Sequence, residues 1–305
     1  MSARKVLIDT DCGIDDAVAI MIALASPELD VIGITTVSGN VSLPRVMDNV
    51  TRLLSFLDRM DIPVFRGASG ALVEKTHRAE GIHGTNGLGG VELPPSRIVE
   101  DQERAPAGIH RLARQNPGLT LLALGPLSNI AMAVNLYPEL KDLLGGIVAM
   151  GGAIETGNVT RFAEFNFFAD PESVQYVFDT GIPLSIVTWD ATLSVTHTEA
   201  DLAGMGFAAS ASGRLFLDLQ KVPFDYVARV FGVRGIFLPD PLTAAYLVDP
   251  GIARKVITGG LRMELNQGTL RGASIRWEDR RIAIVLEIDK SRFDAILSRI
   301  IALKR

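Results

Sequence analysis

The sequence predicts an α/β protein with a doubly wound, mostly parallel sheet, helices on both faces and a small antiparallel carboxyl-terminal extension. Short runs rich in β-branched residues alternate with stretches of helical length, as is expected of a covered parallel sheet. With 305 residues, 48% of them hydrophobic, the chain is able to bury a large core. No repeat or linker marks a boundary, so residues 1–305 are expected to form a single domain.

The expected elements follow one another in a regular order. The apolar run at 6–9 predicts a buried strand, and residues 17–25 have the composition of a helix. Further strands are expected at 31–37, 63–66, 119–124, 146–150 and 183–188, and further helices at 44–60, 107–114, 127–136 and 171–180. The last third of the chain has a different pattern. Antiparallel strands are expected there at 256–265, 273–277 and 282–288, before a helix at 291–303.

Composition excludes several classes of function. A net charge of −5 and a pI near 5.5, without a large basic cluster, argue against a nucleic-acid partner. No apolar run of about 18 residues suggests a membrane span, and the amino terminus shows no apolar signal segment. The single cysteine, Cys12, excludes an internal disulfide and fits a reducing compartment. A cytoplasmic location is therefore expected.

The most informative motif is a group of four carboxylates, Asp9, Asp11, Asp15 and Asp16, between the first expected strand and helix. Such turns lie at the carboxyl edge of a parallel sheet, where ligands bind. Like charges packed there resist burial unless a cation neutralises them. Because every ligand would be oxygen, a hard ion such as Ca²⁺ or Mg²⁺ is the natural partner.

Two other interpretations of this motif remain open at this point. Helix capping and the helix dipole explain one or two acids in such a turn, but not four. The aspartyl-phosphate phosphatases also begin with a strand that ends in Asp-x-Asp, here Asp9 and Asp11. That interpretation makes Asp9 a nucleophile.

Polar residues recur after the other expected strands and would meet Asp11 at one edge of the sheet. They lie in the segments VSGN at 37–40, LGPLSN at 124–129 and MGG at 150–152. Beyond them come Asn158, the segment EFN at 164–166, and Asp240 at the start of a helix. Asp240, taken alone, is better explained as an N-cap before proline.

Together these segments resemble the nucleoside hydrolases, the inosine-uridine-preferring nucleoside N-ribohydrolase family. Six segments follow one another in the order found in the family. They are DTDCGIDDA at 9–17, TTVSGN at 35–40, IHGTNGLG at 82–89, LGPLSN at 124–129, MGG at 150–152 and EFN at 164–166. Matched segments in one order are more specific than any single segment.

The resemblance implies Ca²⁺-dependent hydrolysis of the N-glycosidic bond of ribonucleosides, with Asp11 activating water. It implies a Ca²⁺ site formed by Asp11, Asp16, the carbonyl of Leu124 and Asp240. It also implies that ribose is bound by Asp15, Asn40, Met150, Asn158, Glu164 and Asn166. The family often forms homodimers or homotetramers, so a homo-oligomer is expected.

The chain departs from the family at two positions. Cys12 replaces the usual proline, and we interpret it as a packing residue because hard Ca²⁺ disfavours sulfur. Pro239 stands where relatives commonly carry a histidine that protonates the leaving base. His83 is the first alternative donor, and Tyr226 lies in the region that shapes the base pocket. The departure also leaves open a non-catalytic ribonucleoside sensor. Trp189, at a strand end, favours a core position over stacking on a base.

Overall fold

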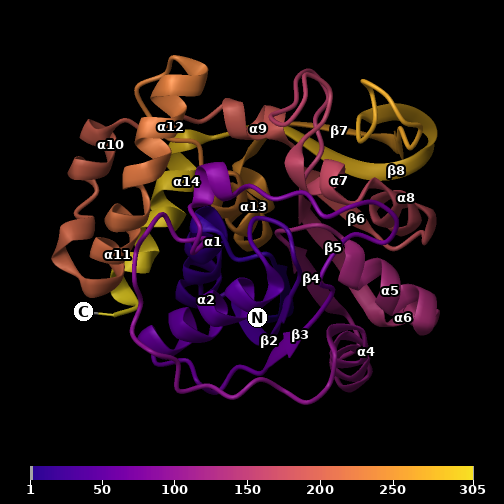
Figure 1. Ribbon diagram of the computed structural model, residues 1–305, viewed down its shortest axis with the longest axis horizontal. Coiled ribbons are helices and arrows are strands. Elements are labelled where there is room, and N and C mark those ends of the chain that lie inside the picture. The colour runs from indigo at the N-terminus through magenta and orange to yellow at the C-terminus, as the bar shows by residue number, and fades with distance from the viewer. Residues whose placement is uncertain (1–2, 305) are drawn as a thin grey trace.

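One mixed sheet organises the computed structural model, which describes residues 3–304 and leaves aside the side chains of residues 279–281 (Figure 1). Across these residues the sheet has eight strands in the order β3-β2-β1-β4-β5-β6-β8-β7. The strands are β1 (Arg4–Thr10), β2 (Leu29–Thr36), β3 (Val64–Arg66), β4 (Leu119–Ala123), β5 (Leu144–Met150), β6 (Leu184–Val187), β7 (Ala253–Met263) and β8 (Ser274–Ile288). All neighbouring pairs are parallel except β7 with β8.

The strand order places a topological switch point between β1 and β4. From β1 the chain proceeds to β2 and β3 on one side, and from β4 it proceeds to β5 and β6 on the other. Asp9 of β1 pairs with Ala123 of β4, and the N–H of Leu124 donates to the carbonyl of Asp9 at 2.8 Å. The turns that follow these two strands therefore meet in the crevice where open α/β sheets bind ligands.

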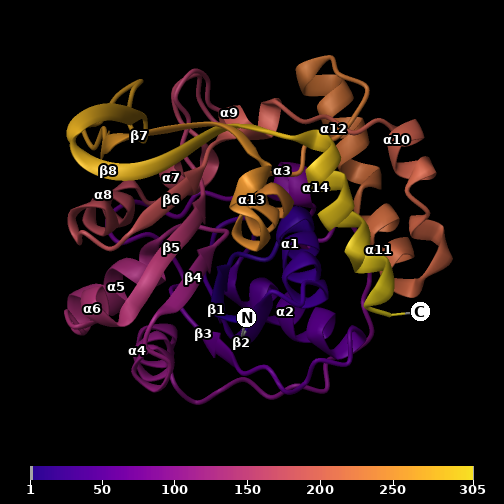
Figure 2. The same ribbon diagram turned by 180° about the vertical axis from the view of Figure 1, so that it is seen from behind.

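Helices cover both faces of the sheet (Figure 2). They are α1 (Ile14–Ala25), α2 (Leu43–Phe56), α3 (Glu80–His83), α4 (Ala105–Gln115), α5 (Ser128–Leu136), α6 (Leu140–Leu143), α7 (Phe165–Ala169), α8 (Pro171–Asp179), α9 (Trp189–Leu193), α10 (Glu199–Gly204), α11 (Ala211–Leu219), α12 (Lys221–Phe231), α13 (Pro239–Val248) and α14 (Lys290–Leu297). One hydrophobic cluster joins α1, α2, α11, α13 and α14 to one face. A second joins α4, α5 and α8 to the opposite face.

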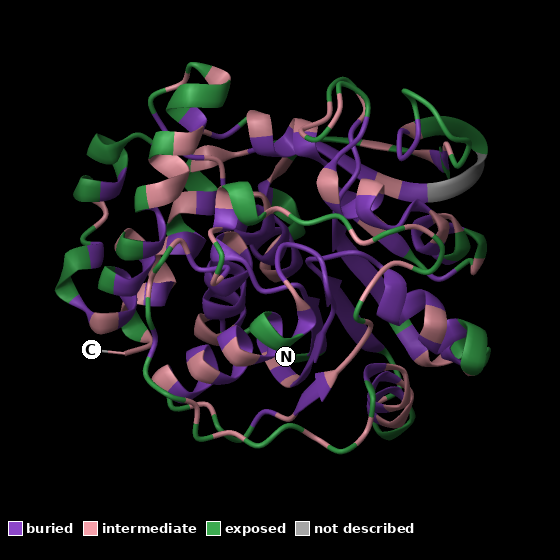
Figure 3. Cartoon of the chain, in the orientation of Figure 1, coloured by how far each residue is buried: buried purple, intermediate pink, exposed green. Residues whose placement is uncertain are grey.

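Helix α1 lies at the centre of the first layer. Its sequence IDDAVAIMIALA is apolar on nearly every side after the first turn, so it needs partners all round. The strands supply one side and α13 another, and Figure 3 shows α1 and the central strands of the sheet as the buried interior. This packing brings the first turns of α1 and α13 to the same edge of the sheet.

The predicted fold class is confirmed, with corrections in the last third. The strands predicted at 273–277 and 282–288 are parts of one strand, β8, which begins at Ser274 and pairs parallel with β6 and antiparallel with β7. The ladder skips between them, because Gly259 pairs with Ile282 and Gly260 with Trp277. The short helices α9 to α12 were not predicted; such helices depend on tertiary packing more than on intrinsic propensity. Within residues 3–304, no helix is both long and apolar enough to cross a membrane.

Candidate active site

A pocket opens at the carboxyl edge of the sheet above the switch point. It has about 910 Å³ of empty space, including its open mouth. Its lining includes Asp15, Asn40, His83, Leu124, Met150, Asn158, Glu164, Asn166, Tyr226 and Asp240. The pocket therefore gathers all the predicted site residues except Asp11 and Asp16, which lie immediately behind the lining.

Three carboxylates form the acidic end of this pocket. Asp15 and Asp16 come from the first turn of α1, and Asp240 comes from the first turn of α13. One oxygen of each lies within 4.8 Å of the others. The three acids are thus held by two helix amino termini, whose partial positive charge favours carboxylates.

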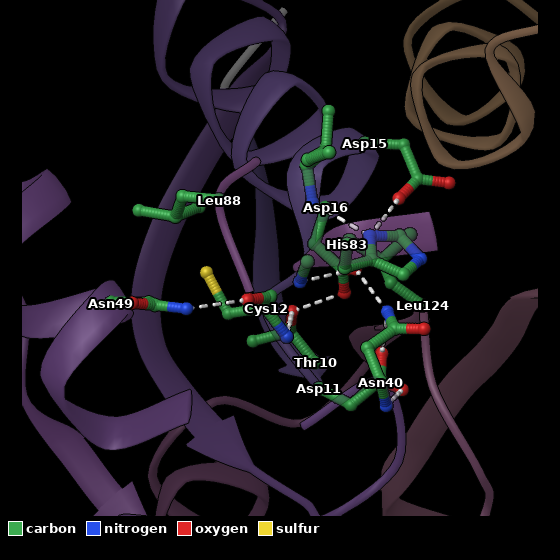
Figure 4. A network of polar contacts seen from close by, with 12 residues as sticks. Thr10, Asp11, Cys12, Asp15, Asp16, Asn40, Asn49, His83, Leu88 and Leu124 are labelled. Atoms are coloured by element: carbon green, nitrogen blue, oxygen red, sulfur yellow. Dashed lines mark hydrogen bonds and ion pairs between the residues drawn. The ribbon is translucent and has the colours of Figure 1, made fainter. Parts of the chain in front are cut away.

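Asp16 is fixed by several donors. Its Oδ1 accepts from the Thr10 hydroxyl, and its Oδ2 accepts from the N–H of Gly13 at 2.9 Å and from Asn40 Nδ2 at 3.1 Å (Figure 4). Its pKa is nevertheless raised, first by burial and then by the charge of Asp15. Hydrogen bonds hold the carboxylate in place without supplying the positive charge that it lacks.

Asp11 lies beside this group rather than within it. Its Oδ2 accepts from the backbone N–H of Asn40 at 2.6 Å, and its Oδ1 accepts from Asn40 Nδ2 at 3.1 Å. Asn40 Nδ2 therefore bridges Asp11 and Asp16 (Figure 4). Gly39 is required here because a Cβ would overlap Asp11 Oδ2. Burial and the charge of Asp16 raise the pKa of Asp11 well above its usual range.

The acidic end fits a hard divalent cation. Asp15 Oδ1 and Asp240 Oδ1 are buried and have no hydrogen-bond partner. Burial and the charges of Asp15 and Asp16 raise the pKa of Asp240 well above its usual range. Among the described residues that line the pocket there is no lysine or arginine. Oxygens bound to one Ca²⁺ at 2.3–2.6 Å lie no more than about 5 Å apart, and one oxygen of each of the three carboxylates lies within 4.8 Å of the others.

His83 lies at the carboxyl end of α3 and contacts the start of α1. Its Nδ1 accepts from the N–H of Ile14 at 3.1 Å, so the ring proton is placed on Nε2. The side chain is buried, and burial lowers its pKa to about 4. Asp15 Oδ1 is 3.8 Å from Nδ1, which is too far for a hydrogen bond. At neutral pH His83 is therefore an uncharged N–H donor.

Glu164 and Asn166 hold the wall opposite α1. Glu164 accepts from the N–H groups of Asn166 and Gly152, each at 2.8 Å, and burial raises its pKa to about 7. Asn166 Nδ2 donates to the carbonyls of Leu124 at 2.8 Å and Met150 at 3.2 Å. The α7 turn thereby ties the ends of β4 and β5 together.

Asn158 completes this wall from the loop before α7. Its Oδ1 accepts from the N–H of Phe165 at 2.9 Å. The loop itself is anchored by Asp190, whose carboxylate accepts from the N–H groups of Ile154 and Glu155 at 2.7 and 2.9 Å. These contacts hold Asn158 against the pocket that it lines.

Comparison with known proteins identifies the family. The model of the family described as inosine-uridine preferring nucleoside hydrolase matches residues 6–295. The chain belongs to this family. It is 37% identical over 304 residues to a probable uridine nucleosidase 2 of Arabidopsis thaliana, covering 94% of each chain. It is 34% identical over 277 residues to the pyrimidine-specific ribonucleoside hydrolase RihB of Escherichia coli (strain SE11), covering 90% of this chain and 88% of that one.

Solved structures of nucleoside hydrolases share the whole fold. A plant nucleoside hydrolase, the PpNRh1 enzyme, superposes with a TM-score of 0.92 at 34% identity, over 98% of this chain and 99% of that chain. A purine-preferring ribonucleoside hydrolase from Gardnerella vaginalis gives the same TM-score and coverage at 30% identity. These similarities support a ribonucleoside hydrolase enzyme.

Asp9 does not occupy the place that the phosphatase interpretation needs. Its Oδ1 accepts from the Thr35 hydroxyl at 2.6 Å and from Asn129 Nδ2 at 2.7 Å, and the side chain is fully buried. It is absent from the pocket lining. In this nucleoside hydrolase Asp9 joins β1 to β2 and α5 beneath the site. Cys12 is likewise buried in the core, as predicted.

The other end of the pocket contains residues that the motifs did not reveal. Trp189 begins α9 and is buried in a small hydrophobic cluster with Met150 and Ala153, as predicted, but it also lines the pocket. Phe231, Phe237 and Gln220 line the same end, and Pro239 stands beside Asp240. The amphipathic pattern of α12 was the available signal, but it does not show which ligand its face meets.

Proposed function

We propose that the chain hydrolyses the N-glycosidic bond of ribonucleosides to ribose and free base in a Ca²⁺-dependent reaction. The observation that carries the proposal is the acidic end of the pocket. Buried carboxylates with unpartnered oxygens there share one cavity with His83 and the amides of Asn158 and Asn166. The family and its relatives support the ribonucleoside class of substrate.

The proposed ligands of Ca²⁺ are Asp11, Asp16, Asp240 and the carbonyl of Leu124. That carbonyl accepts one hydrogen bond, from Asn166, and retains a second lone pair. When bound, the ion would supply a fixed positive charge that orients ribose hydroxyls and lowers the pKa of water. Asp15 is an alternative ligand, because its Oδ1 has no hydrogen-bond partner and its carboxylate lies beside those of Asp16 and Asp240. Experiments must distinguish Asp15 from Asp11 as the ligand.

In the proposed reaction the oxygen of water bonds to C1′ as the bond from C1′ to the base nitrogen breaks. Asp11 would accept the water proton, because a carboxylate beside the proposed ion can hold the water and take its proton. The ribose is bound by residues that line the pocket, namely Asp15, Asn40, Met150, Asn158, Glu164 and Asn166. Carboxylate and amide groups suit vicinal hydroxyls, and 2′-deoxyribose would leave some of them unpaired.

The departing base needs a hydrogen-bond donor or a proton, and Pro239 supplies neither. We propose that the neutral His83 donates through Nε2, because Nδ1 already accepts from Ile14. Tyr226, which also lines the pocket from α12, is the second candidate. Donation to the base stabilises the negative charge that develops on it as the bond breaks.

The test is release of ribose from a panel of ribonucleosides, with and without a chelator. Turnover that a chelator abolishes and Ca²⁺ restores is the expected result. Tight binding without turnover would instead indicate a ribonucleoside sensor. Turnover that is unaffected by chelation would contradict the Ca²⁺ proposal. We also propose a homodimer or homotetramer in the cytoplasm, which sedimentation and fractionation would test.

A further inference from the structure

The end of the pocket away from the carboxylates has a different chemistry. It is formed by α9, by α12 with its junction to α11, and by the segment that leads into α13. Its apolar lining consists of Pro223, Val227, Phe231, Phe237 and Pro239. Because the acidic end suits the hydroxyl-rich ribose, this aromatic and aliphatic end is left for the base.

Two polar groups at this end have no hydrogen-bond partner. Gln220, at the junction of α11 and α12, is 1% exposed, and its Nε2 is buried and unpaired. Trp189, at the start of α9, is 6% exposed, and its Nε1 is also buried and unpaired. Both residues line the pocket. Leaving such a group unsatisfied costs free energy, so a ligand that supplies acceptors would recover it.

Both unpaired groups are N–H donors, which determines the ligand that they favour. Indole nitrogen donates and never accepts, and in Gln220 it is the amide nitrogen that is buried without a partner. His83 adds a third donor, because its Nδ1 accepts from Ile14 and its proton lies on Nε2. The unpartnered groups at the described base end of the pocket are therefore donors, which match ring carbonyl oxygens and oppose amino groups.

We propose that Gln220 and Trp189 recognise the nucleobase and select oxo bases over amino bases. This inference rests on the proposed hydrolysis of ribonucleosides. Uracil and cytosine differ by a carbonyl or an amino group at C4, and hypoxanthine and adenine differ in the same way at C6. An amino group placed against these N–H groups would leave donors facing donors, which a buried site rejects strongly. The relatives named above differ in base preference, so their names do not decide this point.

The experiment compares kcat/KM for uridine with cytidine and for inosine with adenosine. The wild-type enzyme is expected to favour the oxo member of each pair at least tenfold. Gln220→Glu keeps the shape and replaces the donor by an acceptor, so it should lower each ratio about tenfold, the equivalent of one hydrogen bond. Trp189→Phe removes the second donor and should lower the ratios by a smaller factor. Gln102→Glu, on the exposed surface, introduces the same charge change and should leave both ratios unaltered.

Binding of free uracil and cytosine, measured by calorimetry, provides a result that does not depend on turnover. Preferential binding of uracil that Gln220→Glu abolishes would support the inference even in a slow enzyme. Equal ratios in the wild type and in Gln220→Glu, for both turnover and binding, would overturn it while leaving the hydrolase function intact. Failure to release any of the four bases would instead overturn the proposed function. Circular dichroism and thermal melting would verify that each variant is folded.

Discussion

Replacing His83 by asparagine or glutamine separates its two contacts. In the wild type, Nδ1 of His83 accepts from the N–H of Ile14 at 3.1 Å. Asparagine places an amide oxygen near the position of Nδ1, so it retains this acceptor, but it lacks the donor at Nε2. Glutamine reaches the position of Nε2 with an amide N–H and loses the contact with Ile14. The two variants therefore test the leaving-group role and the structural role of one side chain independently.

The expected magnitudes follow from these contacts. Loss of a preorganised donor aimed at a developing negative charge costs about 10²–10³ in kcat, so His83→Asn should reduce turnover of uridine and inosine by about 100-fold. Loss of one neutral hydrogen bond costs about 1 kcal/mol, so His83→Gln should be slightly less stable than His83→Asn but more active. Because burial lowers the pKa of His83 to about 4, the wild-type rate should show no titration of this ring near pH 6.5.

The assay compares natural nucleosides with 4-nitrophenyl riboside, whose leaving group needs little assistance. His83→Asn should slow cleavage of the nitrophenyl riboside by less than about fivefold, since only leaving-group stabilisation is lost. Tyr226→Phe serves as the parallel test of the second candidate donor. If His83→Asn slowed both kinds of substrate equally, His83 would position α1 or the sugar, and the leaving-group assignment would be wrong.

Other predictions concern the acidic end of the pocket and Glu164. Metal analysis should find one Ca²⁺ per chain and none in Asp240→Asn; a stoichiometric transition metal would contradict the assignment. Asp11→Asn should lower kcat by at least about 10²-fold, whereas Asp15→Ala should mainly raise KM; the opposite pattern would exchange their roles. The pKa of Glu164 is raised from 4.5 to about 7, so its contribution to stability is complete below pH 4.5 and is lost as pH rises through 7. In urea unfolding of the metal-free protein, Glu164→Gln should gain about 3 kcal/mol relative to wild type between pH 4.5 and pH 8; a constant difference would refute the shift.

Local chemistry made much of the fold and part of the site predictable from sequence. The run at 6–9 and the acids after it are consecutive, so a strand, a turn and a helix amino terminus place Asp15 and Asp16 together whatever the rest of the chain does. The alternation of strands and helices predicted the parallel sheet in the same way. Because parallel strands end at one edge, the segments after β2, β4 and β5 could be expected to converge there.

The sequence by itself thus determined the fold class, the acidic motif and the segments that surround the pocket. Only the tertiary structure decided which carboxylate oxygens lie together, because Asp240 reaches Asp15 and Asp16 through the packing of α13 on α1. It also decided the tautomer of His83, which depends on a contact with Ile14, 69 residues away in the chain. Gln220 and Trp189 belong to no motif, and their meaning comes from burial without a partner in a shared cavity. Such properties arise from long-range packing, which consecutive residues do not encode.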